Sequence, residues 1–115
     1  MWLFRRPANI PQWTFEQVKQ QAIRPDKAVQ LIDVREVKEH TATPKHNPIP
    51  TALSMPFSTF SPEAVQTLPQ ETVVLYCEAG VRAQQAAERI LKQNSNTKQV
   101  AYYPGSHREW REKSN

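Results

Sequence analysis

The fold is decided by the stretch TVVLYCEAGVR at residues 72–82, which runs into AQQAAERILKQ at residues 83–93. Its first half is a short apolar run rich in β-branched residues, which predicts a buried strand ending at Cys77. The second segment places apolar residues at 83, 86, 87, 90 and 91, the spacing of one helix face. The loop between them contains Gly80, one of only two glycines in the chain. The sequence therefore predicts a strand, a tight loop and a helix, with the cysteine where the strand ends.

The position of Cys77 favours a reactive thiol. The first N–H groups of a helix have no partner inside the helix and carry the positive end of its dipole. A thiol held beside them, with Arg82 alongside, is biased toward the nucleophilic thiolate. A lone cysteine is otherwise more often an inert buried residue. Here the strand end, the glycine loop, the arginine and the helix start together favour a nucleophile.

Strand and helix patterns alternate along the whole chain. Strands are predicted at residues 29–34, 52–56, 72–77 and 100–103, and helices at 15–24, from 61, at 83–93 and from 106. This alternation predicts a parallel sheet with helices on its faces, joined by right-handed crossovers. A chain of 115 residues suffices for one such domain.

Two motifs resemble those of the rhodanese family, sulfurtransferases that carry sulfur as a cysteine persulfide. Residues 77–82 match the Cys-x-x-Gly-x-Arg of the family's active-site loop, and residues 33–36 look like its Asp-x-Arg-Glu. The resemblance implies an α/β fold with a small open, mostly parallel five-stranded sheet flanked by helices on both faces. It divides the chain into an N-terminal arm at residues 1–13 and a rhodanese-like domain at residues 14–115.

The arm is basic and aromatic, with Trp2, Phe4 and Trp13. The favoured interpretation is a strand or arm that caps the domain. The alternative is a surface that covers a partner.

Asp33 and Arg35 follow the first predicted strand. In an open α/β sheet the carboxyl ends of the strands meet at one rim, where ligands bind, so both residues are expected near Cys77. A buried carboxylate at a strand end usually pairs with arginine or accepts from neighbouring amides. We therefore interpret both as supporting residues rather than as direct participants in catalysis.

Two segments depart from the family pattern. Where relatives commonly carry Gly-His-Ile-Pro-Gly-Ala, residues 47–52 are Asn-Pro-Ile-Pro-Thr-Ala, so Asn47 and the prolines are expected to make the turn instead. Ser106 stands where a second glycine often follows Gly105, and its spacing to Glu109 predicts a capping box for the last helix.

The resemblance implies a two-step covalent cycle without metal or cofactor. The Cys77 thiolate takes the outer sulfur of a small donor, thiosulfate or a persulfide, and passes it to a thiol, to a protein acceptor, or to cyanide in vitro. Backbone N–H groups of the loop residues Glu78, Ala79, Gly80, Val81 and Arg82 would stabilise the anionic sulfur. The Arg82 guanidinium would favour the thiolate and hold an anionic group of the donor. Glu78 opposes thiolate formation and repels anionic donors unless it points to solvent.

Other functions are less favoured by the sequence. The six-residue loop is one residue shorter than that of rhodanese-like phosphatases, and Tyr76 replaces the histidine of other cysteine phosphatases, so a phosphatase or arsenate reductase is disfavoured. A rhodanese-fold binding module with little turnover, docking through the arm, remains an alternative. His40 and His46 have no matching partners for a metal site.

The composition of the chain restricts its expected partners and its expected location in the cell. The net charge is +4, but basic residues are interleaved with acidic ones, so no nucleic-acid partner is expected. One cysteine excludes an intrachain disulfide. No stretch is apolar enough for a signal peptide or a membrane span, and the chain is expected to be cytoplasmic.

Overall fold

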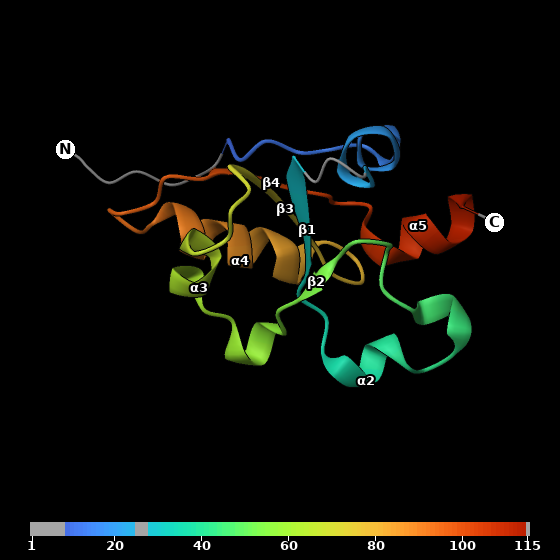
Figure 1. The fold of residues 1–115 in the computed structure, drawn as a ribbon. Coiled ribbons are helices and arrows are strands. Elements are labelled where there is room, and N and C mark those ends of the chain that lie inside the picture. The colour runs from blue at the N-terminus through green and yellow to red at the C-terminus, as the bar shows by residue number, and fades with distance from the viewer. Residues whose placement is uncertain (1–8, 25–27, 115) are drawn as a thin grey trace.

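The computed structural model describes residues 9–24 and 28–114. Its centre is one sheet of four parallel strands in the order β2-β1-β3-β4 (Figure 1). The strands are β1 (Val29–Asp33), β2 (Leu53–Ser54), β3 (Thr72–Tyr76) and β4 (Gln99–Tyr102). The predicted α/β class and the parallel sheet are confirmed.

The expected five strands are reduced to four in the described part of the chain. Beside β4, the chain before the first helix makes a single parallel bridge, from Gln12 to Tyr102. Two backbone hydrogen bonds hold it, Trp13 N–H to Tyr102 O at 2.9 Å and Tyr102 N–H to Pro11 O at 3.1 Å. Pro11 has no N–H to extend the ladder, which limits the pairing at this point. The arm residues Trp2 and Phe4 lie outside the described residues.

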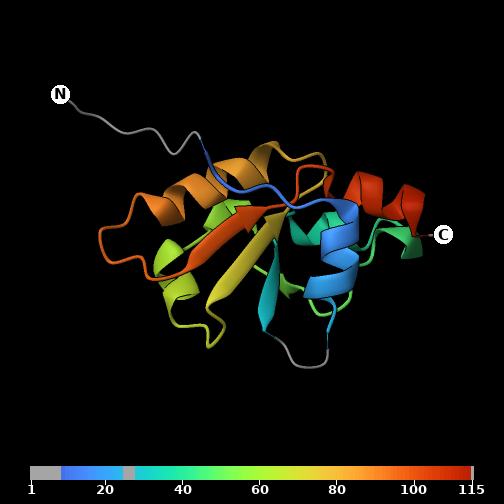
Figure 2. The same cartoon turned by 90° about the horizontal axis from the view of Figure 1, so that it is seen from above.

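Helices cover both faces of the sheet, as expected. The alternation of strand side chains sends Val73, Leu75 and Cys77 to one face and Val74 and Tyr76 to the other. The first face packs against α3 (Pro62–Gln66) and α4 (Val81–Leu91). The second packs against α1 (Phe15–Gln17), the π-helical turn η1 (Val18–Ala22) and α5 (Ser106–Lys113). Figure 2 shows β1, β3 and β4 between these two layers of helices. In the described ranges, no helix has the length and apolarity needed to cross a bilayer.

The helix starts follow the sequence signals in two places. The Thr14 and Gln17 side chains cap one another's backbone at the start of α1, and the Ser61 hydroxyl accepts from Ala64 N–H at the start of α3. The predicted capping box of the last helix is wrong, because α5 has no side-chain cap and Ser106 is its first residue.

The segment between β1 and β2 is more regular than its sequence indicates. It contains α2 (Val37–His40) and the 3₁₀ turn η2 (Pro44–His46), and a further 3₁₀ turn, η3 (Phe57–Thr59), follows β2. The start of α2 is tied by a hydrogen bond from Glu36 N–H to Glu39 Oε1 at 2.7 Å. Glutamate at a cap position is not among the residues that normally predict a helix start, so this helix was not expected.

The turn at residues 47–52 is made by Thr51 rather than Asn47. Thr51 takes a φ of +74°, whereas Asn47 keeps a negative φ of −56°. Thr51 occupies the position of the second glycine in the family pattern, where a left-handed backbone suits glycine. The chain therefore keeps the turn and places a β-branched residue in a strained conformation. The Gln30 side chain supports it by donating to Thr51 O at 2.9 Å.

Candidate active site

The strand register brings the predicted site residues to one edge of the sheet. Asp33, at the end of β1, lies opposite Tyr76, the last residue of β3, and Cys77 follows directly. Tyr102 pairs with Leu75, so the turn after β4 leaves the sheet beside the cysteine. Residues far apart in sequence therefore meet at the carboxyl ends of three parallel strands.

The loop after Cys77 folds a backbone amide onto the sulfur. Gly80 N–H donates to Cys77 Sγ at 3.0 Å, and Gly80 has a φ of +109° as it leads into α4. A Cβ at Gly80 would lie 2.7 Å from Pro104 O, so glycine is also required by close packing. Cys77 is buried, with 1% of its surface exposed, and α4 begins four residues after it. The positive end of the α4 dipole thus lies next to the thiol.

The start of α5 forms the other wall of the loop. His107 N–H donates to Cys77 O at 2.9 Å and Arg108 N–H donates to Glu78 O at 3.1 Å, so two otherwise unpaired helix amides hold the loop backbone. The buried Ser106 hydroxyl accepts from Cys77 N–H at 3.1 Å, donates to Tyr103 O at 2.8 Å and lies 3.9 Å from Cys77 Sγ. Ser106 does this with a φ of +57°. Ser106 thus has a strained backbone at the position where its hydroxyl contacts Cys77.

Replacing Ser106 with alanine is expected to lower the free energy of unfolding by about 1–3 kcal/mol, because Cys77 N–H would be buried without an acceptor. Ser106→Gly removes the same hydroxyl but relieves the left-handed strain, so it should be about 1 kcal/mol more stable than the alanine variant. Denaturant unfolding of the three proteins measures both differences. Equal stability of wild type and Ser106→Ala would show that the hydroxyl does not hold the loop.

Asp33 and Arg35 form a fully buried ion pair under the site. The Arg35 guanidinium donates to Asp33 Oδ2 from Nη2 at 2.9 Å and from Nε at 3.2 Å, and Arg35 N–H donates to Oδ1 at 2.9 Å. Tyr76 Oη donates to the same carboxylate at 2.7 Å and accepts from Ile49 N–H at 3.0 Å. Burial, followed by the charge of Asp33, raises the pKa of Tyr76, so the phenol keeps its proton. The pair joins β1 to β3 and to the segment at residues 46–49.

Arg82 is already paired in this structure. Its Nη1 and Nη2 donate to the two carboxylate oxygens of Glu39 at 2.8 and 2.9 Å, which ties α4 to α2. The hydrogen bonds from Arg82 lower the pKa of Glu39 to about 2, so the carboxylate is charged near neutral pH. The two side chains are about 30% exposed, and they lie at the surface of the site.

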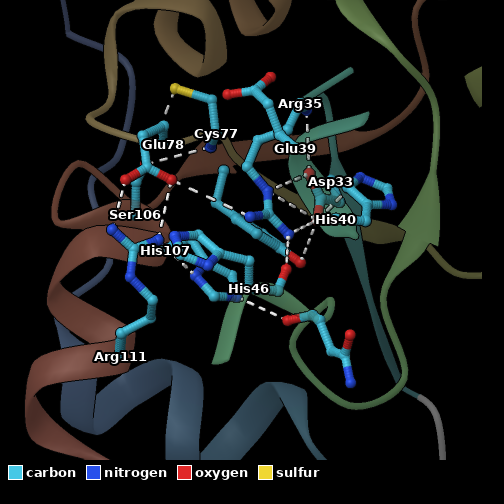
Figure 3. A network of polar contacts seen from close by, with 12 residues as sticks. Asp33, Arg35, Glu39, His40, His46, Cys77, Glu78, Ser106, His107 and Arg111 are labelled. Atoms are coloured by element: carbon cyan, nitrogen blue, oxygen red, sulfur yellow. Dashed lines mark hydrogen bonds and ion pairs between the residues drawn. The ribbon is translucent and has the colours of Figure 1, made fainter. Parts of the chain in front are cut away.

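Glu78 is partly exposed and faces two arginines. Arg111 binds its carboxylate through Nη1 at 2.9 Å and Nη2 at 2.5 Å, and Arg35 Nη1 lies 4.0 Å from Oε1 (Figure 3). The Arg111 hydrogen bonds lower the pKa of Glu78. Arg111 also donates to His107 Nδ1 at 3.0 Å, while His107 Nε2 donates to Asn47 O at 2.6 Å. Burial lowers the pKa of His107, which suits a neutral ring bonded on both sides.

His40 and His46 serve separate contacts. His40 Nε2 lies 3.5 Å from Asp33 Oδ2, and the His46 ring stacks on that of His107 with centroids 6.3 Å apart. Among residues 9–24 and 28–114, no group of three or more His, Cys, Asp or Glu side chains is arranged to hold a metal ion.

The sequence of the chain matches a known protein family over almost its whole length. The rhodanese-like domain family matches residues 14–113, which include every residue of the site. The chain belongs to the rhodanese-like domain family. No curated protein matches the sequence.

Solved structures share this rhodanese-like fold. The human single-domain sulfurtransferase TSTD1 is 27% identical, with a TM-score of 0.63, and the match covers 93% of this chain and all of that one. The single-domain sulfurtransferase RDL2 of Saccharomyces cerevisiae is also 27% identical, with a TM-score of 0.65 and 88% of each chain covered. Protein RPA3614 of Rhodopseudomonas palustris, described as a possible tyrosine phosphatase, has a TM-score of 0.75 over 95% of this chain and 85% of that one. At 19% identity, that likeness shows the fold alone.

Sequence reasoning missed three residues of this rhodanese-like site. The sequence pattern predicts only a helix cap at Ser106 and gives no role to Glu39 or Arg111. The position of Ser106 was accessible in principle, because neighbouring parallel strands bring the turns after β3 and β4 together. The Glu39–Arg82 and Glu78–Arg111 pairs had no local signal, since the partners are 43 and 33 residues apart.

Proposed function

We propose that this protein is a sulfurtransferase that moves a sulfane sulfur from thiosulfate or a persulfide to a thiol through a Cys77 persulfide. The observation that carries the proposal is the Gly80 N–H aimed at Cys77 Sγ beside the start of α4. An amide and a helix dipole at the sulfur favour an anion there, both before and after transfer. Support also comes from the two single-domain sulfurtransferases that share the fold.

In the loading step the Cys77 thiolate attacks the outer sulfur of the donor. An Sγ–S bond forms as the donor's own S–S bond breaks, and the bonding pair leaves with sulfite or with a thiolate. Cys77 then holds a terminal sulfur with one negative charge. In the second step an acceptor thiolate attacks that sulfur, and the bonding pair returns to Cys77 Sγ. In vitro, cyanide takes the sulfur as thiocyanate.

The loop residues divide this work. Backbone N–H groups from Glu78 to Arg82, of which that of Gly80 already points at the sulfur, stabilise the terminal anion. Arg82, at the second position of α4, lies at the surface of the site with its charge paired to the Glu39 carboxylate. Asp33 and Arg35 keep the ends of β1 and β3 in register and take no part in sulfur transfer.

A donor reaches the Cys77 sulfur from the side of the exposed loop residues. Because Cys77 is only 1% exposed, a donor reaches Sγ after a small outward shift of the neighbouring loop side chains. Ala79 and Val81, which flank Gly80, are exposed, so such a shift breaks no buried packing of theirs. The single cysteine of the chain cannot form an intrachain disulfide, which suits a reducing compartment such as the cytoplasm.

Treatment with thiosulfate or an alkyl persulfide is expected to add the mass of one sulfur atom to the intact protein, and cyanide should remove it as thiocyanate. Cys77→Ser should acquire no sulfur, because the nucleophile is the only thiol in the chain. Intact mass spectrometry and a colorimetric thiocyanate assay measure both steps. A wild-type protein that gains no sulfur from either donor would refute the proposal and leave a rhodanese-fold binding module.

A further inference from the structure

The cations around Cys77 are neutralised by carboxylates of the chain itself. Arg82 is held by Glu39, and Arg111 is held by Glu78, each through two hydrogen bonds of 2.5–2.9 Å. The third guanidinium, Arg35, is fully buried against Asp33 (Figure 3).

Among the described residues, each of these three guanidiniums therefore faces a carboxylate, and only Arg35 Nη1, 4.0 Å from Glu78 Oε1, is buried without a hydrogen-bond partner of its own. Arg108 contributes its backbone N–H to the loop, and its side chain is exposed. A fourth carboxylate, Glu36, lies next to α2 and is bonded to Ser58 rather than to a cation.

A paired arginine is a poor receptor for a doubly charged donor. To bind the anionic oxygens of thiosulfate, Arg82 must either release Glu39 or hold the donor next to that carboxylate. Two negative charges side by side repel each other. The same holds for Arg111 and Glu78. Glu78 directly follows the nucleophile in the loop, so its charge acts on any anion that approaches Cys77 Sγ.

The exposed apolar residues of this region point to a different kind of donor. Val37 and Val81, the first residues of α2 and α4, are 60% and 66% exposed. The Glu39–Arg82 ion pair bridges these two helices. An alkyl group on the donor can cover apolar side chains of this kind, whereas a sulfonate cannot.

We infer that the donor is a persulfide of low net charge with an alkyl substituent, and that Glu78 and Glu39 are specificity residues that disfavour the dianion thiosulfate. The inference rests on the proposed function and narrows its donor class. In the loading step with such a donor, Cys77–S⁻ and R–S–S⁻ give Cys77–S–S⁻ and R–S⁻. One Sγ–S bond forms, one donor S–S bond breaks, and the total charge is conserved.

Three donors test whether the net charge of the donor determines the rate of sulfur loading. The persulfides of 2-mercaptoethanol and 3-mercaptopropionate have similar alkyl groups and the same reacting bond, but the second carries one additional negative charge. Thiosulfate is the second dianion. The second-order rate constant for loading, followed by intact mass, is expected to be about tenfold larger for the hydroxyethyl persulfide than for either dianion.

Glu78→Gln and Glu39→Gln keep the shape of the side chains and remove their charge. Each is expected to raise the loading rate constants of both dianions about fivefold relative to that of the hydroxyethyl persulfide. Glu71→Gln is the matched control, because Glu71 is exposed and precedes β3 at the end of the strand opposite Cys77. Thermal unfolding midpoints establish whether the variants are folded, because the two ion pairs that they break are partly exposed, at 20–30% of the side-chain surface, and such pairs contribute less stability than buried ones.

The outcomes are distinguishable. A wild-type protein that loads fastest with thiosulfate overturns the donor class and leaves the sulfurtransferase function standing. Equal donor ratios in Glu78→Gln, Glu39→Gln and Glu71→Gln overturn the role of the two carboxylates. Failure of all three donors to add sulfur to the wild type overturns the proposed function, and this inference with it.

Discussion

Replacing Arg35 with methionine is expected to cost the domain about 3–5 kcal/mol of unfolding free energy, because it leaves the Asp33 carboxylate buried without its cation. Asp33 and Arg35 are both fully buried, and the remaining donors to Asp33 are Tyr76 Oη and the backbone N–H of residue 35. Neither donor carries a positive charge, and His40 Nε2, 3.5 Å from Asp33 Oδ2, forms no hydrogen bond with it. Urea unfolding of the wild type and the variant measures the loss.

A second ion pair in the same protein provides a control for burial. Arg82 and Glu39 form a two-bonded guanidinium–carboxylate pair, but their side chains are about 30% exposed. Arg82→Met should therefore cost less than about 1 kcal/mol. The double variant Asp33→Asn/Arg35→Met should be more stable than Arg35→Met alone, because it removes the uncompensated charge. Equal losses in Arg35→Met and Arg82→Met would refute burial as the cause.

Substituting Gly80 with alanine is expected to slow persulfide formation about a hundredfold, the usual effect of losing one preorganised donor to an anion. The added Cβ would lie 2.7 Å from Pro104 O, and the residue would be held at a φ of +109°. Backbone strain and overlap together should also cost about 2 kcal/mol or more of stability. The loop relieves both by moving, which withdraws Gly80 N–H from Cys77 Sγ. Single-turnover loading by intact mass, under conditions where the variant is folded, measures the rate.

Gly105→Ala is the control for this substitution. Gly105 has a φ of −62°, and the closest atoms to an added Cβ, Glu109 Oε1 and Cδ, can rotate away, which leaves Glu109 Cβ at 3.0 Å. Sulfur loading should stay within about threefold of wild type, because the amide at the sulfur is untouched. If Gly80→Ala loaded sulfur as fast as Gly105→Ala, the amide would have no role in stabilising the sulfur anion.

Local patterns predicted the elements that carry the site. The apolar run at residues 72–76 and the helical spacing from residue 83 gave β3 and α4 within two residues of their observed bounds. The signals failed where structure depends on unusual caps or on context. The N-cap of α2 is a glutamate, and the π-helical turn η1 continues α1. The sheet has four strands instead of the expected five in the described residues, with a single bridge next to Pro11 beside β4.

The sequence by itself determined that a lone cysteine lies between a buried parallel strand and a helix start, with a glycine and an arginine at fixed spacing. That much follows from side-chain periodicity and backbone conformational preferences, which act over a few residues. Only the tertiary structure decided that Ser106 meets Cys77 and that Glu39 and Glu78 neutralise Arg82 and Arg111. These partners are 29–43 residues apart in the chain, and they meet because parallel strands end at one edge of the sheet.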